Sequence, residues 1–383
     1  MPQPLHLDVA EFSPDAWRWT LTDHAGAYIQ DHQVRLDPTH ACYRALLDLS
    51  GYLRVYADPH RRQQDERRLI AEVGDYVGAQ VLGEAIARKL RERSHPSVVV
   101  RVRVPESAQF LLTLPLEIAR IDGAPLDGVS FVFQAVGEKP REVLPIGRRL
   151  RLLALFSVPP DGSALNLRRE RRMLRQLVGD LAGAAGPAVD LRVLQYGVTR
   201  DSLKQVLEEA EGWDVIHFSG HGLPGALVLE KPDGTTDQVS STDLAKMLEQ
   251  AGARVKLVVL SACLSAAASI EQSLRWLGVA PANAPSRDAS ASGSAQVAPT
   301  VAQALTQSLG CAVVAMRYAV EDEFASNFGR ALYEQLIPQL LSKELTIMSC
   351  LSARERKDFA RMLGKIESSL DLVQADREGE SGY

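Results

Sequence analysis

The sequence predicts an α/β protein whose mainly parallel central sheet is covered by helices on both faces. From about Arg149 onward, short apolar segments alternate with amphipathic segments, which is the order typical of strand–helix units. The apolar segments are rich in β-branched residues and nearly continuous in apolar character, as strands buried on both faces are. The 383-residue chain is 46% hydrophobic, which is ample for a buried core.

The strands and helices of this region can be assigned in order. Strands are expected at residues 151–158, 191–198, 213–219, 255–262 and 312–320. Helices are expected at 166–183, 200–212 and 241–253, each opened by a Thr, Ser or Asp cap candidate and closed by Gly. The first helix places an apolar stripe on one face, formed by Leu174, Leu177, Val178 and Leu181. Its arginine cluster is expected to be a solvated face.

The region before Arg149 predicts a smaller α+β unit. Antiparallel strands are expected on either side of a turn at His24–Gly26, followed by a helical stretch over 62–93 and a strand over 97–104. Two later segments interrupt the strand–helix order. After His221 we expect a loop, a short strand pair around Ala226–Glu230 and a turn at 232–234, and residues 280–299, rich in Ala, Ser and Pro, predict a mobile surface loop.

Composition excludes several classes of protein. The formal net charge is −5, from 43 Lys and Arg against 48 Asp and Glu, so no sustained basic face favours nucleic acid or anionic membrane. The N-terminus lacks the basic segment and apolar core of a signal peptide, and no apolar run is suited to spanning a bilayer. The four cysteines are far apart and form no C-x-x-C motif, which favours a reducing cytoplasm.

The stretch HFSGHGLPG, from His217 to Gly225, fits three unrelated chemistries. His217 and His221 have the spacing of two zinc ligands on a helix, and the glycines spell the dinucleotide-binding pattern G-x-G-x-x-G. A His followed by Gly after an apolar strand is also how one class of cysteine protease presents its base. Glycines at 220 and 222 disfavour the helix that zinc would need, and Pro224 disfavours the helix that a pyrophosphate would need. We therefore expect neither a metal nor a cofactor.

The cysteine-protease interpretation also needs a nucleophile, and Cys263 is the candidate. Cys263 ends an apolar strand, as His221 does, and the functional edge of an open α/β sheet lies at the carboxyl ends of its strands. A thiolate attacks a carbonyl carbon while an imidazole transfers the proton. The N–H groups of Gly222 and Cys263 could stabilise the oxyanion. Cys263 follows His221 by 42 residues, against roughly 50 in caspases.

The remaining histidine and cysteine candidates have ordinary interpretations. His217, on the same predicted strand as His221, is expected to be a hydrogen-bonded core histidine. Cys42, Cys311 and Cys350 lie largely in apolar segments and are expected to be small core hydrophobes.

Several blocks together resemble the CHAT domain, a caspase-like cysteine peptidase module related to separases and widespread in bacteria. The blocks are WDVIHFSGHG, VKLVVLSAC and CAVVAMRYAVEDEFASNFGRALYEQL, and LPLEIARIDGAPL upstream is similar to a Leu-Pro-Trp-Glu-Leu-Leu stretch of that family. The resemblance makes His221 the base and Cys263 the nucleophile. Leu116 and Tyr318 stand where Trp is usual, and Leu264 stands where Glu or Gln is common.

The resemblance implies a caspase-like α/β/α sandwich and a four-part organisation. Residues 1–60 would be a strand-rich region, 61–145 the upstream part of the module or a pseudo-caspase-like half, 146–345 the catalytic core, and 346–383 a C-terminal helix and tail. The implied activity is cleavage of a protein partner through a thioester, in bacterial defence or cell-death signalling, under the control of a sensor or activator. Two alternatives are a silent caspase-like scaffold that binds partners and a non-proteolytic acyl-transfer enzyme.

Asp322 and Arg287 are candidates for more specific roles. Val320 and Asp322 resemble the Val-Thr-Asp stretch by which separases place an acid under a basic P1 residue, so Asp322 would contact Arg or Lys of the substrate. The alternative is that Glu321, Asp322 and Glu323 form the acidic first turn of the following helix. Arg287, in the 280–299 loop, is a candidate site of self-cleavage, because caspases carry a processing linker at the corresponding position.

Overall fold

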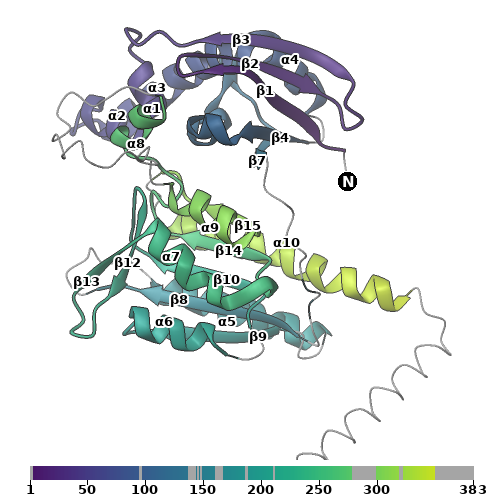
Figure 1. Cartoon of the computed structure of the whole chain (residues 1–383), viewed down its shortest axis with the longest axis vertical. Coiled ribbons are helices and arrows are strands. Elements are labelled where there is room, and N and C mark those ends of the chain that lie inside the picture. Colours follow the sequence, from purple (N-terminus) through teal and green to yellow (C-terminus); the bar gives the residue numbers. More distant parts are fainter. Residues whose placement is uncertain are drawn as a thin grey trace, which may run out of the picture.

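The computed structural model describes residues 3–94, 97–136, 149–159, 167–185, 189–209, 212–277, 299–318 and 322–349, together with positions 144 and 146. The side chains at 136, 180–185, 252–253, 271, 322 and 338–349 lie outside this description. The described residues form two lobes, each built on its own five-stranded sheet (Figure 1). Residues 5–136 are called the N-terminal lobe here, and residues 150–349 the C-terminal lobe.

The sheet of the N-terminal lobe is mixed, with strand order β3-β2-β1-β4-β7. Its members are β1 (Leu5–Ser13), β2 (Ala16–Thr22), β3 (Tyr28–Arg35), β4 (Val98–Pro105) and β7 (Val129–Val136). The first three strands are antiparallel neighbours, whereas β4 runs parallel to β1 and β7. The predicted hairpin turn is confirmed, since Asp23 accepts the backbone N–H groups of Ala25 and Ala27.

Helices and short segments complete the N-terminal lobe. They are α1 (Tyr43–Leu47), α2 (Leu49–Tyr56), α3 (Arg62–Tyr76), the π-helical segment η1 (Val77–Gly83), α4 (Glu84–Arg93), the 3₁₀ segments η2 (Glu106–Thr113) and η3 (Leu116–Ile118), and the strands β5 (Arg120–Ile121) and β6 (Ala124–Pro125). The predicted helical stretch over 62–93 is therefore present, with a π-helical interruption. At its end Gly83 has φ 89°, a conformation that favours glycine.

The C-terminal lobe has a parallel sheet with strand order β15-β14-β10-β8-β9. Its members are β8 (Leu150–Ser157), β9 (Val189–Gln195), β10 (Val215–Gly220), β14 (Leu257–Ser261) and β15 (Ala312–Ala315). Every residue of β8 and β10 is buried, as expected for strands covered on both faces. The mixed α/β class and the parallel sheet predicted from the sequence are confirmed. The last strand is shorter than predicted, because it ends at Ala315.

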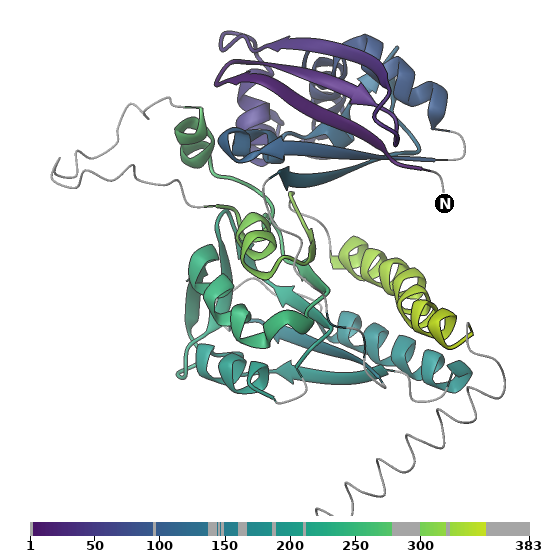
Figure 2. The ribbon, with the colours of Figure 1, turned by 45° about the vertical axis from the view of Figure 1, so that its right-hand side comes forward.

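Helices pack on both faces of this sheet. The helical segments of the C-terminal lobe are α5 (Leu167–Ala185), α6 (Arg200–Leu207), α7 (Ser241–Leu248), the 3₁₀ segment η4 (Glu249–Arg254), α8 (Ile270–Trp276), α9 (Val301–Leu309) and α10 (Asp322–Ser349). One face is covered by α6, α7 and α9 around Ile216, Phe218 and Val258. The other is covered by α5 and α10, which lie beside each other in Figure 2. Most arginines of α5 are exposed, as predicted.

The segment after β10 forms a small three-stranded antiparallel sheet. Its strands are β11 (Gly222–Leu223), β12 (Ala226–Glu230) and β13 (Thr236–Ser240). Ser240 then caps α7 by accepting the N–H of Asp243. The predicted strand pair after His221 is therefore present, and no helix intervenes between His221 and β12.

The two lobes are joined by specific contacts. Helix α8 packs on the N-terminal lobe, where Leu277 is part of the core and Ser273 Oγ donates to the Leu47 carbonyl at 3.1 Å. Arg317, just beyond β15, donates to the carbonyls of Leu112 and Leu114. The chain that follows the predicted nucleophile is thus fixed to both lobes.

Candidate functional site

Two neighbouring strands bring His221 and Cys263 to one edge of the sheet. Strands β10 and β14 are parallel, with Ser219 opposite Ser261. His221 lies two residues beyond Ser219, and Cys263 lies two residues beyond Ser261. Both side chains are partly exposed, and Cys263 is a free cysteine. The sequence placed a His and a Cys at two strand ends, and the topology makes those strand ends adjacent.

At Gly222 the chain that follows β10 comes close to the backbone of Cys263 at the end of β14. A Cβ atom at this position would lie 2.3 Å from the carbonyl oxygen of Cys263 and 3.2 Å from Cβ of Ala262. Both neighbours are parts of the backbone or attached directly to it, so neither can swing aside. Glycine is therefore required here for the backbones after β10 and β14 to approach this closely.

The chain turns sharply after Cys263. Leu264 has φ 60°, a left-handed conformation that is strained for a leucine. The N–H of Ser265 donates to the Ala262 carbonyl at 3.3 Å, and the N–H of Ala266 donates to the Met316 carbonyl at 3.0 Å. Met316 in turn donates its N–H to Ser265 Oγ. The turn that carries Cys263 is thus bonded to the residue that follows β15.

The zinc and dinucleotide interpretations are excluded by local structure. His217 lies within β10, so the two histidines do not share the face of a helix. The glycine pattern is followed by β12 instead of a helix, so no helix N-terminus faces it. His217 is fully buried, and its Nδ1 lies 3.0 Å from the hydroxyl of Tyr333, which confirms the prediction of a hydrogen-bonded core histidine.

A buried polar cluster surrounds His217 under helices α5 and α10. Glu170 Oε1 lies 3.2 Å from His217 Nε2, and its other oxygen accepts a short hydrogen bond from Ser219. Burial alone would raise the pKa of Glu170, but the adjacent His217 and the hydroxyl of Ser219 outweigh it and hold this pKa below its ordinary value. Burial and the nearby Glu170 charge raise the pKa of Tyr333 well above its usual range.

Glu170 was not predicted to belong to a buried polar cluster, although its position in the sequence indicates one. Glu170 precedes Met173, Leu174 and Leu177 by three, four and seven residues, so it continues the buried stripe of α5. A carboxylate on the apolar face of a helix is a departure from amphipathic patterning. It indicates a buried partner, because a buried charge is costly without one.

The other predicted residues are distributed as follows. Cys42 and Cys311 are buried members of hydrophobic cores, as predicted. Asp322 begins α10 and Glu323 follows in its first turn, where Glu323 pairs with Arg169 at 3.2 Å. The side chain of Asp322, together with Val320, Arg287, Cys350 and most of the 280–299 loop, lies outside the described residues.

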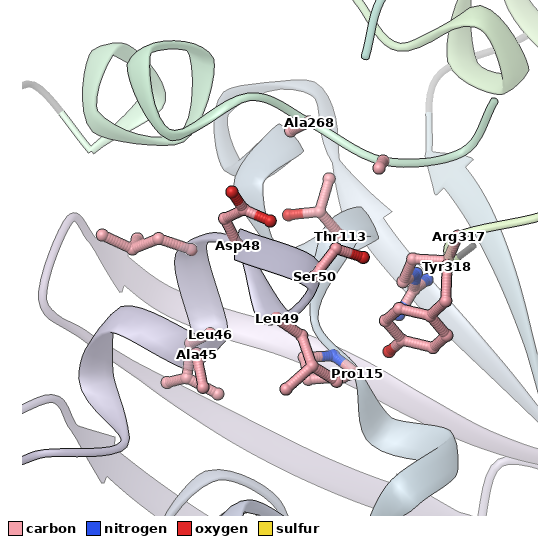
Figure 3. A pocket seen from close by; sticks show the side chains of 12 residues that line it. Ala45, Leu46, Asp48, Leu49, Ser50, Thr113, Pro115, Ala268, Arg317 and Tyr318 are labelled. Carbon is pink, nitrogen blue, oxygen red and sulfur yellow. The ribbon is translucent and has the colours of Figure 1, made fainter. Parts of the chain in front are cut away.

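A small, partly open pocket lies where the two lobes meet. The N-terminal lobe contributes polar groups of Asp48, Ser50 and Thr113, and the C-terminal lobe contributes Ala268 and Tyr318 (Figure 3). Tyr318 donates to Glu117, and burial followed by the Glu117 charge raises its pKa. Ala267 and Ala268, which line the pocket, follow the turn that carries Cys263.

Comparison with known protein families identifies the CHAT domain. The family model of the CHAT domain matches residues 163–354, which is half of the chain and includes His221, Gly222 and Cys263. No curated protein matches the chain. Among the described helices, none has the length and apolar character needed to cross a bilayer.

Proposed function

Because the chain belongs to the CHAT domain family, whose members are related to caspase-like cysteine peptidases, we propose that it is a cysteine endopeptidase with His221 as base and Cys263 as nucleophile. The observation that carries the proposal is the contact of Gly222 with Cys263 at the paired ends of β10 and β14. The proposal includes a caspase-like arrangement of the C-terminal lobe. The parallel sheet with α5 and α10 on one face and α6, α7 and α9 on the other supports it.

The proposed reaction follows from the chemistry of these groups. The Cys263 thiol gives its proton to the imidazole of His221, and the thiolate attacks the carbonyl carbon of the scissile bond. The N–H groups of Gly222 and Cys263 stabilise the oxyanion that forms. The imidazolium of His221 then protonates the leaving amine, which departs and leaves a thioester on Cys263. Water, deprotonated by His221, hydrolyses the thioester and releases the acid product and the thiol.

The substrate and setting are narrower parts of the proposal. The substrate is a protein partner cut after a basic residue, with Asp322 as the P1 contact. A partner protein controls the activity in bacterial defence or cell-death signalling in the cytoplasm. Free cysteines at 42, 263 and 311 are compatible with a reducing compartment. The four-part division at 60, 145 and 345 also stays a proposal.

The test compares purified wild-type protein with Cys263→Ala and His221→Ala. Both variants should stay folded, because neither side chain is fully buried, and both should lose cleavage of protein partners encoded nearby by about 10³-fold or more, since the two groups act as a unit. Cys311→Ala, at a buried cysteine in the core beneath α9, is the matched control and should keep its activity. Cleavage by folded Cys263→Ala protein would refute the peptidase. Wild-type protein that binds a partner without cutting it would favour the silent scaffold.

A further inference from the structure

The buried cluster formed by Glu170, His217, Ser219 and Tyr333 joins the two helices on one face of the sheet to the strand that precedes His221. Glu170 comes from α5, His217 and Ser219 come from β10, and Tyr333 comes from α10. Each of the four residues is at most 4% exposed. Two contacts run from Glu170 to β10, and one runs from His217 to Tyr333.

On β10 the cluster lies directly before His221, and the same face of the sheet continues on β14 toward Cys263. Side chains alternate between the faces of a sheet, and Val215 belongs to the core under α5 and α10. His217 and Ser219 therefore face these helices. On β14 the same face carries Leu257 and Val259, and then Ser261, which also helps to hold the pKa of Glu170 down. Two residues further along the chain after Ser219 and Ser261 come His221 and Cys263.

Stability alone does not explain a charged group at this place. Replacing a buried ion pair by well-packed apolar residues is often neutral or stabilising, because the desolvation of the charges offsets their attraction. The same core contains Phe156, Met173 and Val259, so apolar side chains are available for such packing. The polar cluster contributes directional contacts. Hydrogen bonds fix the relative positions of α5, β10 and α10 more narrowly than apolar contacts do.

The helix pairing is itself built around Glu170. A Cβ at Gly329 of α10 would lie 3.4 Å from Met173 Cε and 3.9 Å from Glu170 Oε1, so α10 approaches α5 closely above the carboxylate. Among the described side chains, the titratable groups that the three elements direct at one another here are Glu170, His217 and Tyr333.

We propose that Glu170, His217 and Tyr333 are positioning residues that hold the end of β10, and with it the His221 imidazole, in register with Cys263 at the end of β14. This inference rests on the proposed roles of His221 and Cys263. It does not require that the substrate be a protein, because the geometry it concerns is that of the imidazole and the thiol.

The test uses the full chain with Glu170→Gln, which keeps the shape of the side chain and removes its charge. The rate of Cys263 alkylation by iodoacetamide is measured from pH 5 to 10, with the modified residue identified by mass spectrometry, alongside kcat and KM for any cleaved substrate. The matched control is Glu323→Gln, which removes a carboxylate that joins the same two helices at the surface. Tyr333→Phe is the second variant, since it removes one hydroxyl and keeps the ring.

Disturbed positioning should weaken the thiol–imidazole interaction. In Glu170→Gln the alkylation of Cys263 should slow, and kcat should fall by roughly 10²-fold with KM little changed, the loss expected of a displacement near 1 Å. Tyr333→Phe should show a smaller change in the same direction, and Glu323→Gln should match the wild type.

The outcomes separate this proposal from the peptidase proposal. If Glu170→Gln and Tyr333→Phe are less stable but keep the wild-type alkylation profile, the cluster is only structural and the inference is overturned. If Glu170→Gln does not fold, the profile of Tyr333→Phe decides in the same way. If the wild type cleaves nothing but the variants shift the alkylation profile, positioning is supported while the peptidase proposal fails.

Discussion

Replacing Gly222 by alanine should disable the candidate site without unfolding the lobe. The added methyl group would lie 2.3 Å from the Cys263 carbonyl oxygen, whereas carbon and oxygen atoms in contact are about 3.2 Å or more apart. The backbones after β10 and β14 must therefore separate by almost 1 Å. A displacement of that size costs roughly 10²-fold in rate, and overpacking a well-packed site costs about 1–3 kcal/mol in stability.

The assay combines thermal melting with the rate at which Cys263 reacts with a peptide-based thiol electrophile. Gly222→Ala should stay folded and react roughly 10²-fold more slowly than the wild type. Gly179→Ala is the matched control, because Gly179 lies in α5 with no atom within 4 Å of the added Cβ and no positive φ. It should be neutral or stabilised by up to about 1 kcal/mol.

One result would refute this reasoning. If Gly222→Ala reacts at the wild-type rate and melts at the wild-type temperature, the close approach of the two strand ends is not needed for the site.

Three further predictions concern other charged groups. Asp214→Asn should lower the free energy of unfolding, measured in urea, by about 3 kcal/mol, the lower end for breaking a buried pair. The reason is that Asp214 is fully buried, whereas its partner Lys256, at 2.8 Å, can reach water. A loss under about 1 kcal/mol would contradict this. The pKa of Glu170 is lower folded than unfolded, so its stabilisation is present above about pH 4.3 and is lost as pH falls through the folded pKa. The melting temperatures of wild type and Glu170→Gln should therefore converge as the pH falls below about 4.3, and a constant difference would argue against an ionised Glu170. Asp322→Ala should abolish the preference for Arg over neutral P1 peptides and Glu323→Ala should keep it; an unchanged preference in Asp322→Ala removes Asp322 from the pocket.

The central strands β8, β10 and β14 of the parallel sheet could be predicted because they are buried on both faces. Burial on both faces imposes a continuous apolar run, as in β8, and such runs stand out against the amphipathic helices. The end of β15 could not be predicted in the same way. Its apolar run continues to Met316, but the N–H of Met316 bonds to Ser265 of the turn after Cys263 instead of continuing the ladder. That partner is 51 residues away, beyond the reach of any local pattern.

The candidate site was predictable to the extent that it depends on strand ends. His221 and Cys263 each follow an apolar strand, and parallel strands end at a common edge. The sequence could not order the strands, and the adjacency of β10 and β14 comes from the fold. Glu170 was hidden for a related reason. Its partners His217 and Tyr333 lie 47 and 163 residues further along the chain, so the polar residue in the apolar stripe had no visible counterpart.

The turn that carries Cys263 depends on both lobes, which determines what must be present in any functional experiment. Beyond this turn, α8 packs on the N-terminal lobe through Leu277 and the bond from Ser273 to Leu47. On its other side the turn bonds to Met316, and the next residue, Arg317, bonds to carbonyls of the N-terminal lobe. The family match begins at residue 163, so the N-terminal partners Leu47, Leu112 and Leu114 lie outside it. A fragment limited to 163–354 would expose Leu277 and leave Arg317 without its N-terminal partners, and its inactivity would therefore say nothing about Cys263.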